Sequence, residues 1–343
     1  MNFFENFTAC FTIAEIGVNH NGDMNLAKEM IHAAKEAGAD AVKFQTFKAE
    51  MLVSQDTPKV KYQKITTSAG ESHFEMIKNL ELSCENHFLL MDYCLNKKIK
   101  FLSTPYDVES ARFLHEDLGV EMFKTASADL VDHPLHEYIA STQKPSIVSV
   151  GMANLNEIGE NLAIYKSHNQ EDVILLHCVS NYPCSHESLN LRVMEQLRNN
   201  FDFPVGFSDH SVGNDAALLS VALGAKIIEK HFTLDKNLKG PDHAASATPN
   251  EFKNLTTAIR TAEKILGSLK KGCQLEEAEM SQVSRKSIFL KTNALKDEIL
   301  SEDNLVCLRP GTGIYPSFLN KIIGRRLKYN LAKGTQLDWS HLI

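Results

Sequence analysis

The sequence has no Cys-x-x-Cys pair among its seven cysteines, no basic run and no apolar stretch that could span a bilayer. Without paired cysteines, a disulfide scaffold or a cysteine-based zinc site is disfavoured, and we expect reduced thiols. A net charge of −7 argues against a nucleic acid and against an anionic membrane surface as the main partner. The amino-terminal stretch lacks the features of a signal peptide. We therefore expect a cytoplasmic protein with no nucleic-acid or membrane partner.

A Gly-x-Gly-x-x-Gly turn is also missing, which disfavours a dinucleotide-binding doubly wound sheet, the second architecture considered. The chain instead alternates short apolar segments with helical patterns. Strands are predicted to begin near residues 12, 41, 99, 121, 146, 173, 205 and 226. Eight such units over about 265 residues fit an α/β fold of the (β/α)₈ TIM-barrel type. We predict this barrel over residues 1–267.

Three further regions differ in composition and patterning from the barrel units. The stretch from Lys48 to Leu82 is long and polar, and it is predicted to be an excursion that forms a lid or is disordered. Residues 268–284 are charged without apolar periodicity, which indicates a linker. Residues 285–343 hold short apolar segments separated by turns, which predicts a small carboxy-terminal domain.

Two histidines stand at equivalent places in consecutive units. His210 follows the predicted strand near 205, and His231 follows the strand near 226. Because a right-handed crossover makes such strands parallel, both imidazoles are expected at the same edge of the sheet. Either histidine alone could be a hydrogen-bonded structural residue. Together with neighbouring carboxylates, they predict a divalent metal site.

Other polar residues also follow the predicted strands, where the active sites of such barrels lie. They are Glu15, Lys43, Gln45, Ser103, Thr104, Lys124, Ser127, Asp129, Ser149, Ser180, Tyr182, Ser208, Glu229 and Asp242. Two lysines with several hydroxyls suit a phosphate and a carboxylate. A metal with open positions could polarise a carbonyl, and carboxylates beside it could move protons. A phosphate hydrolase would fit this set as well, so the residues alone leave the reaction open.

Nine segments resemble the sialic acid synthase family, in order along essentially the whole chain. They are AEIGVNHNG (14–22), KFQTF (43–47), STPYD (103–107), VSVGMA (148–153), SNYP (180–183), FSDH (207–210), EKHFTLDK (229–236), GPDH (240–243) and LRPGTG (308–313). The resemblance implies a (β/α)₈ barrel with an antifreeze-like (SAF) domain at 285–343 and a domain-swapped homodimer. It also implies a divalent ion of the manganese type, with Mg²⁺ or Co²⁺ as alternatives.

The implied reaction joins phosphoenolpyruvate to an N-acetylated amino sugar. It would give a nine-carbon 2-keto sugar acid and phosphate, with cleavage of the C–O bond of phosphoenolpyruvate. The family's roles would then fall on the matching positions. Phosphoenolpyruvate would meet Lys43, Thr104, Lys124, Ser127, Ser149 and Ser208, the sugar would meet Gln45, Tyr182, Glu229 and Asp242, and the metal would meet His210 and His231.

Three further expectations come from the same resemblance. Glu229 and Glu15 are the candidates for proton transfer, with Glu229 the stronger, and Lys43 completes the catalytic set. Ser180 and Asp129 are expected in the substrate site, although Asp129 stands where many members have a longer Glu. Arg309, by itself an ordinary surface arginine, would reach the site of the partner protomer.

The substrate sugar is expected to be N-acetylmannosamine, giving N-acetylneuraminate. The GPDH segment resembles the neuraminate and legionaminate branches rather than the pseudaminate branch. The alternative is 2,4-diacetamido-2,4,6-trideoxymannose, giving N,N'-diacetyllegionaminate. A non-catalytic carbohydrate-binding or ice-binding protein is the remaining hypothesis.

Overall fold

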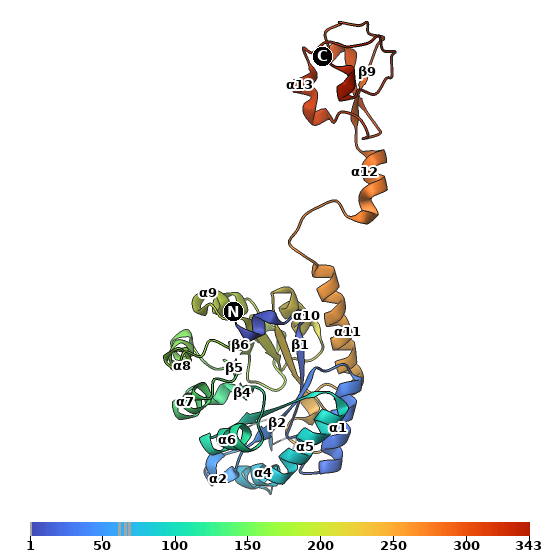
Figure 1. Cartoon of the computed structure of the whole chain (residues 1–343). Helices are drawn as coiled ribbons and strands as arrows, with labels where there is room; N and C mark the ends of the chain where they lie inside the picture. Colours follow the sequence, from blue (N-terminus) through green and yellow to red (C-terminus); the bar gives the residue numbers. More distant parts are fainter. Residues whose placement is uncertain (1, 61–62, 65–66, 68–69) are drawn as a thin grey trace. The chain divides into compact units, whose positions relative to one another are not determined.

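The computed structural model describes residues 2–60, 63–64, 67 and 70–343, and these residues form two compact units. The first unit spans residues 1–267 and the second spans residues 268–343. Figure 1 shows the first unit as a sheet surrounded by helices. Among the described residues, no helix is both long and apolar enough to cross a membrane.

The sheet of the first unit has eight parallel strands in the order β3-β2-β1-β8-β7-β6-β5-β4. The strands are β1 (Phe11–Gly17), β2 (Ala41–Thr46), β3 (Lys100–Pro105), β4 (Phe123–Thr125), β5 (Ser146–Ser149), β6 (Val173–Cys178), β7 (Val205–Asp209) and β8 (Ile227–His231). The two edge strands, β3 and β4, also contact each other. The sheet is therefore a nearly closed barrel, and the predicted fold class is confirmed.

Helices follow the strands in the predicted alternation. They are α1 (Met24–Glu36), α5 (Cys84–Lys97), α6 (Val108–Arg112) with the π-helical turn η2 (Phe113–Asp117), α7 (His133–Ser141), α8 (Leu155–Ser167), α9 (Val193–Phe201), α10 (Asp215–Ala222) and α11 (Pro249–Leu266). Side-chain caps fix the starts of several of these helices. Asp23 caps α1, and Thr248 forms a capping box before Pro249 at the start of α11.

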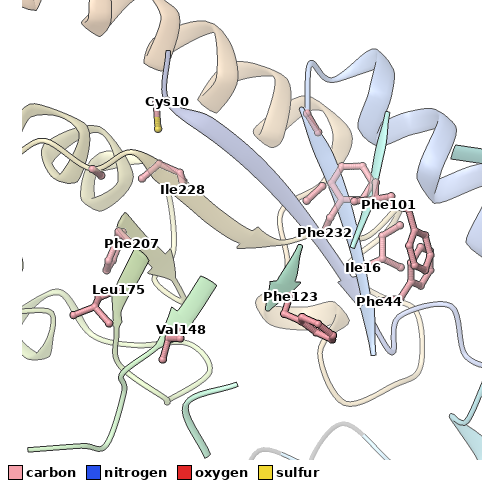
Figure 2. Packing of buried hydrophobic residues seen from close by; sticks show 14 of the residues in the cluster. Cys10, Ile16, Phe44, Phe101, Phe123, Val148, Leu175, Phe207, Ile228 and Phe232 are labelled. Atoms are coloured by element: carbon pink, nitrogen blue, oxygen red, sulfur yellow. The ribbon is translucent and has the colours of Figure 1, made fainter. Parts of the chain in front are cut away.

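The main core lies between the strands and these helices (Figure 2). Residues of the strands that face outward pack there against the apolar stripe of each helix. Phe44 of β2 and Phe101 of β3, for example, stack with ring centroids 5.6 Å apart. Burial of such large side chains is the main favourable contribution to the stability of the barrel.

Side chains inside the barrel form two successive layers, because positions two residues apart on a strand share a face. The first layer is apolar and consists of Ile13, Ala41, Leu102, Met122, Ile147, Leu176 and Ile227. The residues two positions further along the same strands are Glu15, Lys43, Thr104, Lys124, Ser149, Cys178 and Glu229. The layer of the barrel interior near the carboxyl ends of the strands is thus polar, and the layer below it, called the apolar base, is apolar.

Gly206 and Phe4 complete the apolar base of the barrel interior. Gly206 precedes Ser208 on β7, and a Cβ atom there would lie 2.5 Å from Leu176 and 2.7 Å from the carbonyl of Ile227. Only glycine fits this position without a shift of its neighbours. At the amino end, the 3₁₀ turn η1 (Phe3–Asn6) adds the fully buried Phe4 to the same cluster. The polar layer therefore opens only toward the carboxyl ends of the strands.

Among its described residues, the predicted excursion from Lys48 to Leu82 includes the short helices α2 (Ala49–Leu52) and α4 (His73–Asn79). Its residues 61–62, 65–66 and 68–69 lie outside the described residues. Met76 and Leu80 of this segment pack with Val18 and Phe47 in a small apolar cluster. The described part of the excursion is therefore packed against the loops that follow β1 and β2.

The second unit has its own core around an antiparallel pair, β9 (Ser287–Leu290) and β10 (Leu305–Leu308). A further short apolar segment, residues 322–327, begins at the end of α13 (Leu319–Ile322) and adds Ile322 and Leu327 to this core. The segment predicted as a linker contains the helix α12 (Ala278–Ser284). None of the side chains of α12 is buried, which accounts for the lack of apolar periodicity in its sequence.

Candidate active site

A cavity of about 840 Å³ opens at the carboxyl ends of the barrel strands. Thirteen of the predicted site residues line this cavity. They are Glu15, Lys43, Gln45, Lys124, Ser127, Ser149, Ser180, Tyr182, Ser208, His210, Glu229, His231 and Asp242. The structure therefore brings together residues from seven of the eight strands and the loops after them, as expected for the catalytic end of such a barrel.

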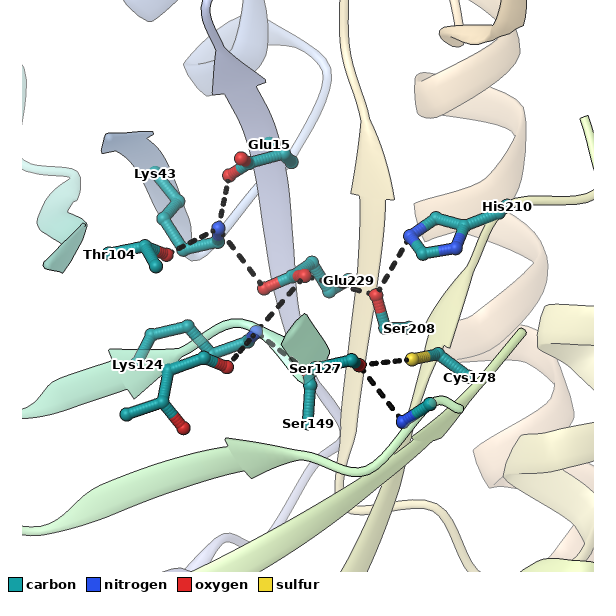
Figure 3. A network of polar contacts seen from close by, with 12 residues as sticks. Glu15, Lys43, Thr104, Lys124, Ser127, Ser149, Cys178, Ser208, His210 and Glu229 are labelled. Atoms are coloured by element: carbon teal, nitrogen blue, oxygen red, sulfur yellow. Dashed lines mark hydrogen bonds and ion pairs between the residues drawn. The ribbon is translucent and has the colours of Figure 1, made fainter. Parts of the chain in front are cut away.

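Lys43 lies at the centre of a buried polar network on the cavity floor (Figure 3). Its ammonium nitrogen is 2.7 Å from Oε2 of Glu15 and donates a hydrogen bond of 2.9 Å to Oγ1 of Thr104. Oε2 of Glu229 lies 3.8 Å away on the other side. Thr104 does not line the cavity itself, so its contact with the site runs through the Lys43 ammonium.

Lys124 approaches Glu229 from the opposite side of the network (Figure 3). Its ammonium nitrogen is 3.5 Å from Oε1 of Glu229 and donates to Oγ of Ser149 at 2.7 Å. Ser208 donates a 3.0 Å hydrogen bond to the same Glu229 oxygen. Glu229 therefore lies between two buried ammonium groups, and its side chain is only 6% exposed.

The two carboxylates of the network differ in their electrostatics. Burial opposes ionisation of Glu229, but Lys124 and Lys43 outweigh it and lower the pKa of Glu229 to about 2. Burial raises the pKa of Glu15 to about 7 in spite of Lys43, and the charge of Glu229 adds to that rise. Near neutral pH, Glu229 is an anion and Glu15 can carry a proton.

The two lysines also differ. Burial disfavours the charged form of Lys43, but Glu15 and Glu229 more than compensate and raise its pKa. Burial lowers the pKa of Lys124, and the charge of Lys43 adds to that effect, although Glu229 opposes it. A bound anion beside Lys124 would favour its charged form.

The two predicted metal ligands meet on one side of the cavity. The ring centroids of His210 and His231 are 5.6 Å apart, and the ring of Tyr182 lies 4.3 Å from His210 and 5.4 Å from His231. Nδ1 of His210 is 2.8 Å from the carbonyl oxygen of Val179. Because a carbonyl only accepts, Nδ1 carries the proton and Nε2 keeps its lone pair.

This arrangement fits a divalent metal ion. Burial lowers the pKa of His210 and lowers that of His231 well below its usual value, so both imidazoles are neutral, as ligation requires. Nδ1 of His231 is buried without a hydrogen-bond partner, 4.0 Å from a carboxylate oxygen of Asp242. No group of three or more His, Cys, Asp or Glu side chains in the described part of the chain is arranged to hold a metal. Substrate or water would thus supply the other ligands.

Ser127 and Cys178 lie next to each other at the wall of the cavity (Figure 3), beside the Gly151 amide. Oγ of Ser127 accepts a 2.9 Å hydrogen bond from the Gly151 amide and lies 2.9 Å from Sγ of Cys178. A Cβ atom on Gly151 would lie 2.7 Å from both Cys178 and Ser180. Burial raises the pKa of the Cys178 thiol, so it is a neutral packing group rather than a nucleophile.

Three candidate residues are not part of this cluster. Ser103 is buried, with its hydroxyl oxygen 2.6 Å from that of Thr46, and it does not line the cavity. Asp129 lies in the 3₁₀ turn η3 (Ser127–Asp129) and does not line the cavity. Its Oδ2 is buried without a hydrogen-bond partner, and burial raises its pKa to about 7. Asp129 therefore lies behind the cavity wall in this structure, and its contact with a substrate stays a prediction. Arg309 is exposed on the second unit at the end of β10, and its role stays a prediction.

Sequence reasoning missed part of the cavity wall. Tyr106 follows β3 directly and lines the cavity, so the rule that polar strand ends form the site could have found it. The excursion contributes an apolar stretch of wall. Its members in the cavity lining are Leu52, Val53, Val60, Met76, Ile77 and Leu80. No sequence period connects these six residues.

Comparison with known proteins agrees with this geometry. A family model described as NeuB matches residues 30–271, and a model of the SAF domain matches residues 296–343. The chain belongs to the NeuB family. The resemblance to sialic acid synthases inferred from the nine segments is thereby confirmed.

Two relatives and one solved structure are similar to this NeuB-family chain over most of its length. It is 46% identical over 337 residues to the N,N'-diacetyllegionaminic acid synthase of Legionella pneumophila, covering 97% of this chain and 94% of the relative. It is 44% identical to the enzyme of the same name from Campylobacter jejuni, covering 92% and 96%. The N-acetylneuraminic acid synthetase of Leptospira borgpetersenii, crystallised with citrate, has a TM-score of 0.71 at 37% identity over 80% and 90% of the chains.

Proposed function

We propose that this protein condenses phosphoenolpyruvate with an N-acetylated amino sugar to give a nine-carbon 2-keto sugar acid and phosphate. The observation that carries the proposal is the pair of buried ammonium groups, Lys43 and Lys124, on either side of Glu229 at the floor of one cavity. A small substrate with a phosphate and a carboxylate suits two fixed cations with hydroxyls around them.

Phosphoenolpyruvate would be held by the lysine pair and the neighbouring hydroxyls. Lys124 with Ser149, and Lys43 with Thr104, already form hydrogen bonds that orient the ammonium groups. Ser127 and Ser208 line the same floor. Such preorganised donors favour the bound anion because no rearrangement is needed when it arrives.

The bond changes balance without a further reactant other than water. C3 of phosphoenolpyruvate bonds to the aldehyde carbon of the sugar, water adds at C2, and phosphate leaves with its bridging oxygen. Glu229 is ionised and can accept a proton, whereas Glu15 can hold one near neutral pH and donate it. These protonation states support Glu229 as the base and Glu15 as the acid.

His210 and His231 would hold the divalent ion, for which Mn²⁺ is the first choice, with Mg²⁺ or Co²⁺ as alternatives. When bound, such an ion supplies Lewis-acid polarisation of the sugar aldehyde. The tautomer of His210, fixed by the Val179 carbonyl, leaves a lone pair available for it. Asp242, Gln45 and Tyr182 would contact the sugar.

The apolar residues that the excursion contributes to the cavity wall favour one of the two candidate sugars. N-acetylmannosamine carries hydroxyl groups at C4 and C6, whereas the 2,4-diacetamido-2,4,6-trideoxy sugar carries an acetamido methyl and a C6 methyl there. Apolar residues such as Leu52, Met76 and Leu80 suit methyl groups better than hydroxyls. Both legionaminate-type relatives support the same choice. We therefore place the diacetamido sugar ahead of N-acetylmannosamine, which the sequence alone favoured.

The test is a reaction with phosphoenolpyruvate, Mn²⁺ and each of the two sugars in turn. Phosphate release and the mass of the keto acid identify the reaction and the sugar. We expect the diacetamido sugar to exceed N-acetylmannosamine in kcat/KM by about 10- to 200-fold, the range for apolar groups in an apolar pocket. Absence of a condensed keto acid with either sugar, in protein that is folded and supplied with metal, would refute the proposed reaction.

A matched pair of variants tests the assignment of the metal ligands. His210→Ala should remove metal-dependent turnover while the barrel still unfolds cooperatively. His177→Ala serves as a control, because His177 is a buried histidine whose Nε2 donates to the Leu189 carbonyl at 2.6 Å and which does not line the cavity. Its loss should lower stability without changing the dependence of the rate on Mn²⁺.

A further inference from the structure

A buried ion pair lies beside the two histidines and outside the polar network of the cavity. Nζ of Lys230 is 2.6 Å from Oδ2 of Asp209, and the two side chains are 5% and 0% exposed. Neither residue lines the cavity. Since removing two charges from water is costly, an isolated buried pair is not a simple source of stability, and its place in the fold calls for a reason.

The position of the pair in the sheet suggests that reason. Asp209 and Lys230 are direct partners in the register of β7 and β8, and they form the last pair of that ladder. His210 directly follows the end of β7, and His231 is the last residue of β8. The ion pair therefore joins the two strands at the point from which both imidazoles project.

The pair also fixes the backbone beyond His210. Oδ1 of Asp209 accepts hydrogen bonds from the amide and the hydroxyl of Ser211, at 2.9 Å and 2.6 Å. Lys230 donates a second hydrogen bond, of 2.8 Å, to the carbonyl of Ser211. Both chain neighbours of His210 are thus bound to Lys230, and Lys230 itself precedes His231.

We propose that Asp209 and Lys230 are positioning residues that set the separation and orientation of the His210 and His231 imidazoles before a divalent ion binds. This inference rests on the proposed metal site. Partners that orient metal ligands from behind commonly contribute a factor of about 10 to 100 in metal affinity. Here one ion pair orients both ligands at once, because it links the strands that carry them.

The experiment compares Mn²⁺ affinity, followed by the electron paramagnetic resonance signal of free Mn²⁺, in three full-length proteins. The test variant is Asp209→Ala with Lys230→Met, which removes both charges together and leaves no unpaired charge in the interior. The control is Asp40→Ala with Arg260→Met, an ion pair of 2.9 Å next to β1 and β2 at their amino ends. Thermal unfolding shows whether the two double variants are equally destabilised.

We expect the test variant to bind Mn²⁺ about 10- to 100-fold more weakly than the wild-type protein. The control should stay within about twofold, because its strands are fixed far from the histidines. If the folded test variant binds as tightly as the wild-type protein, the positioning role is refuted while the metal site stands. If the wild-type protein binds no Mn²⁺, the metal site itself is refuted, and the inference with it.

A milder variant decides the question if the double variant does not fold. Ser211→Ala removes only the hydroxyl donor to Asp209 and leaves the ion pair in place. It should weaken Mn²⁺ binding severalfold with little change in thermal stability. An unchanged affinity in Ser211→Ala would overturn the proposal by itself.

Discussion

The ammonium nitrogen of Lys43 lies 2.7 Å from a carboxylate oxygen of Glu15, yet burial raises the pKa of Glu15 to about 7. If protonated Glu15 is the acid of the reaction, kcat/KM should fall as the pH rises through about 7, because the proton is lost there. Glu15→Gln should lower the rate and remove this limb of the profile. Initial rates of phosphate release from about pH 6 to about pH 8 test this expectation.

Asp242 provides the control for that pH profile. Burial raises its pKa to about 6, so it could produce a limb of its own at lower pH. Asp242→Asn should leave the limb near pH 7 in place, whereas Glu15→Gln should remove it. A limb that survives in Glu15→Gln would show that another group donates the proton.

Removal of the Lys43 ammonium should destabilise the barrel strongly. In Lys43→Met, Glu15 and Glu229 would lie in a buried network with only Lys124 to balance their charges. Loss of one partner from a buried ion pair costs about 3–5 kcal/mol, and we expect that change in the free energy of unfolding in urea. The double variant Lys43→Met with Glu15→Gln balances the charges again and should recover most of the stability without recovering turnover.

Gly151 offers a test of the phosphoenolpyruvate side of the cavity. A methyl group there would crowd Ser127, Cys178 and Ser180 at 2.7–2.9 Å, so these side chains must shift. Gly151→Ala should raise the KM for phosphoenolpyruvate by about tenfold or more and change the KM for the sugar less. Gly159→Ala is the matched control, because a Cβ atom on that helical glycine meets no atom closer than 3.7 Å. It should keep wild-type kinetics and gain about 0.5–1 kcal/mol.

Much of the fold and of the cavity floor follows from local rules. Apolar segments followed by helical patterns were sufficient to predict all eight strands, and the two-residue alternation explains why Lys43 and Glu229 point inward above Ala41 and Ile227. His210 and His231 could be paired because equivalent ends of consecutive parallel strands meet at one edge. These predictions needed only periodicity and the direction of the strands.

The remaining parts depend on tertiary structure. Asp129 was placed in the cavity by its position in a motif, but β4 ends at Thr125 and the chain then turns, so strand alternation no longer governs its side chain. Leu52 and Leu80 of the apolar wall are far apart in a polar stretch, and they share the wall only because α2 and α4 pack together. The ion pair of Asp209 and Lys230 is hidden for a similar reason, since adjacency to the histidines in sequence does not reveal its burial.

If Arg309 of one protomer serves the cavity of its partner, two inactive variants should restore activity when they are mixed. Arg309→Ala and His210→Ala should each be inactive alone, because each lacks one part of every site. If Arg309 acts on the partner's cavity, equal mixing after reversible dissociation gives mixed dimers with one intact site each. Because half of the dimers are mixed, activity should return to about a quarter of the wild-type value. Arg326→Ala, a change of another exposed arginine of the second unit, should keep full activity alone. No recovery in the mixture, with exchange of protomers verified by mass, would show that Arg309 does not act across a dimer.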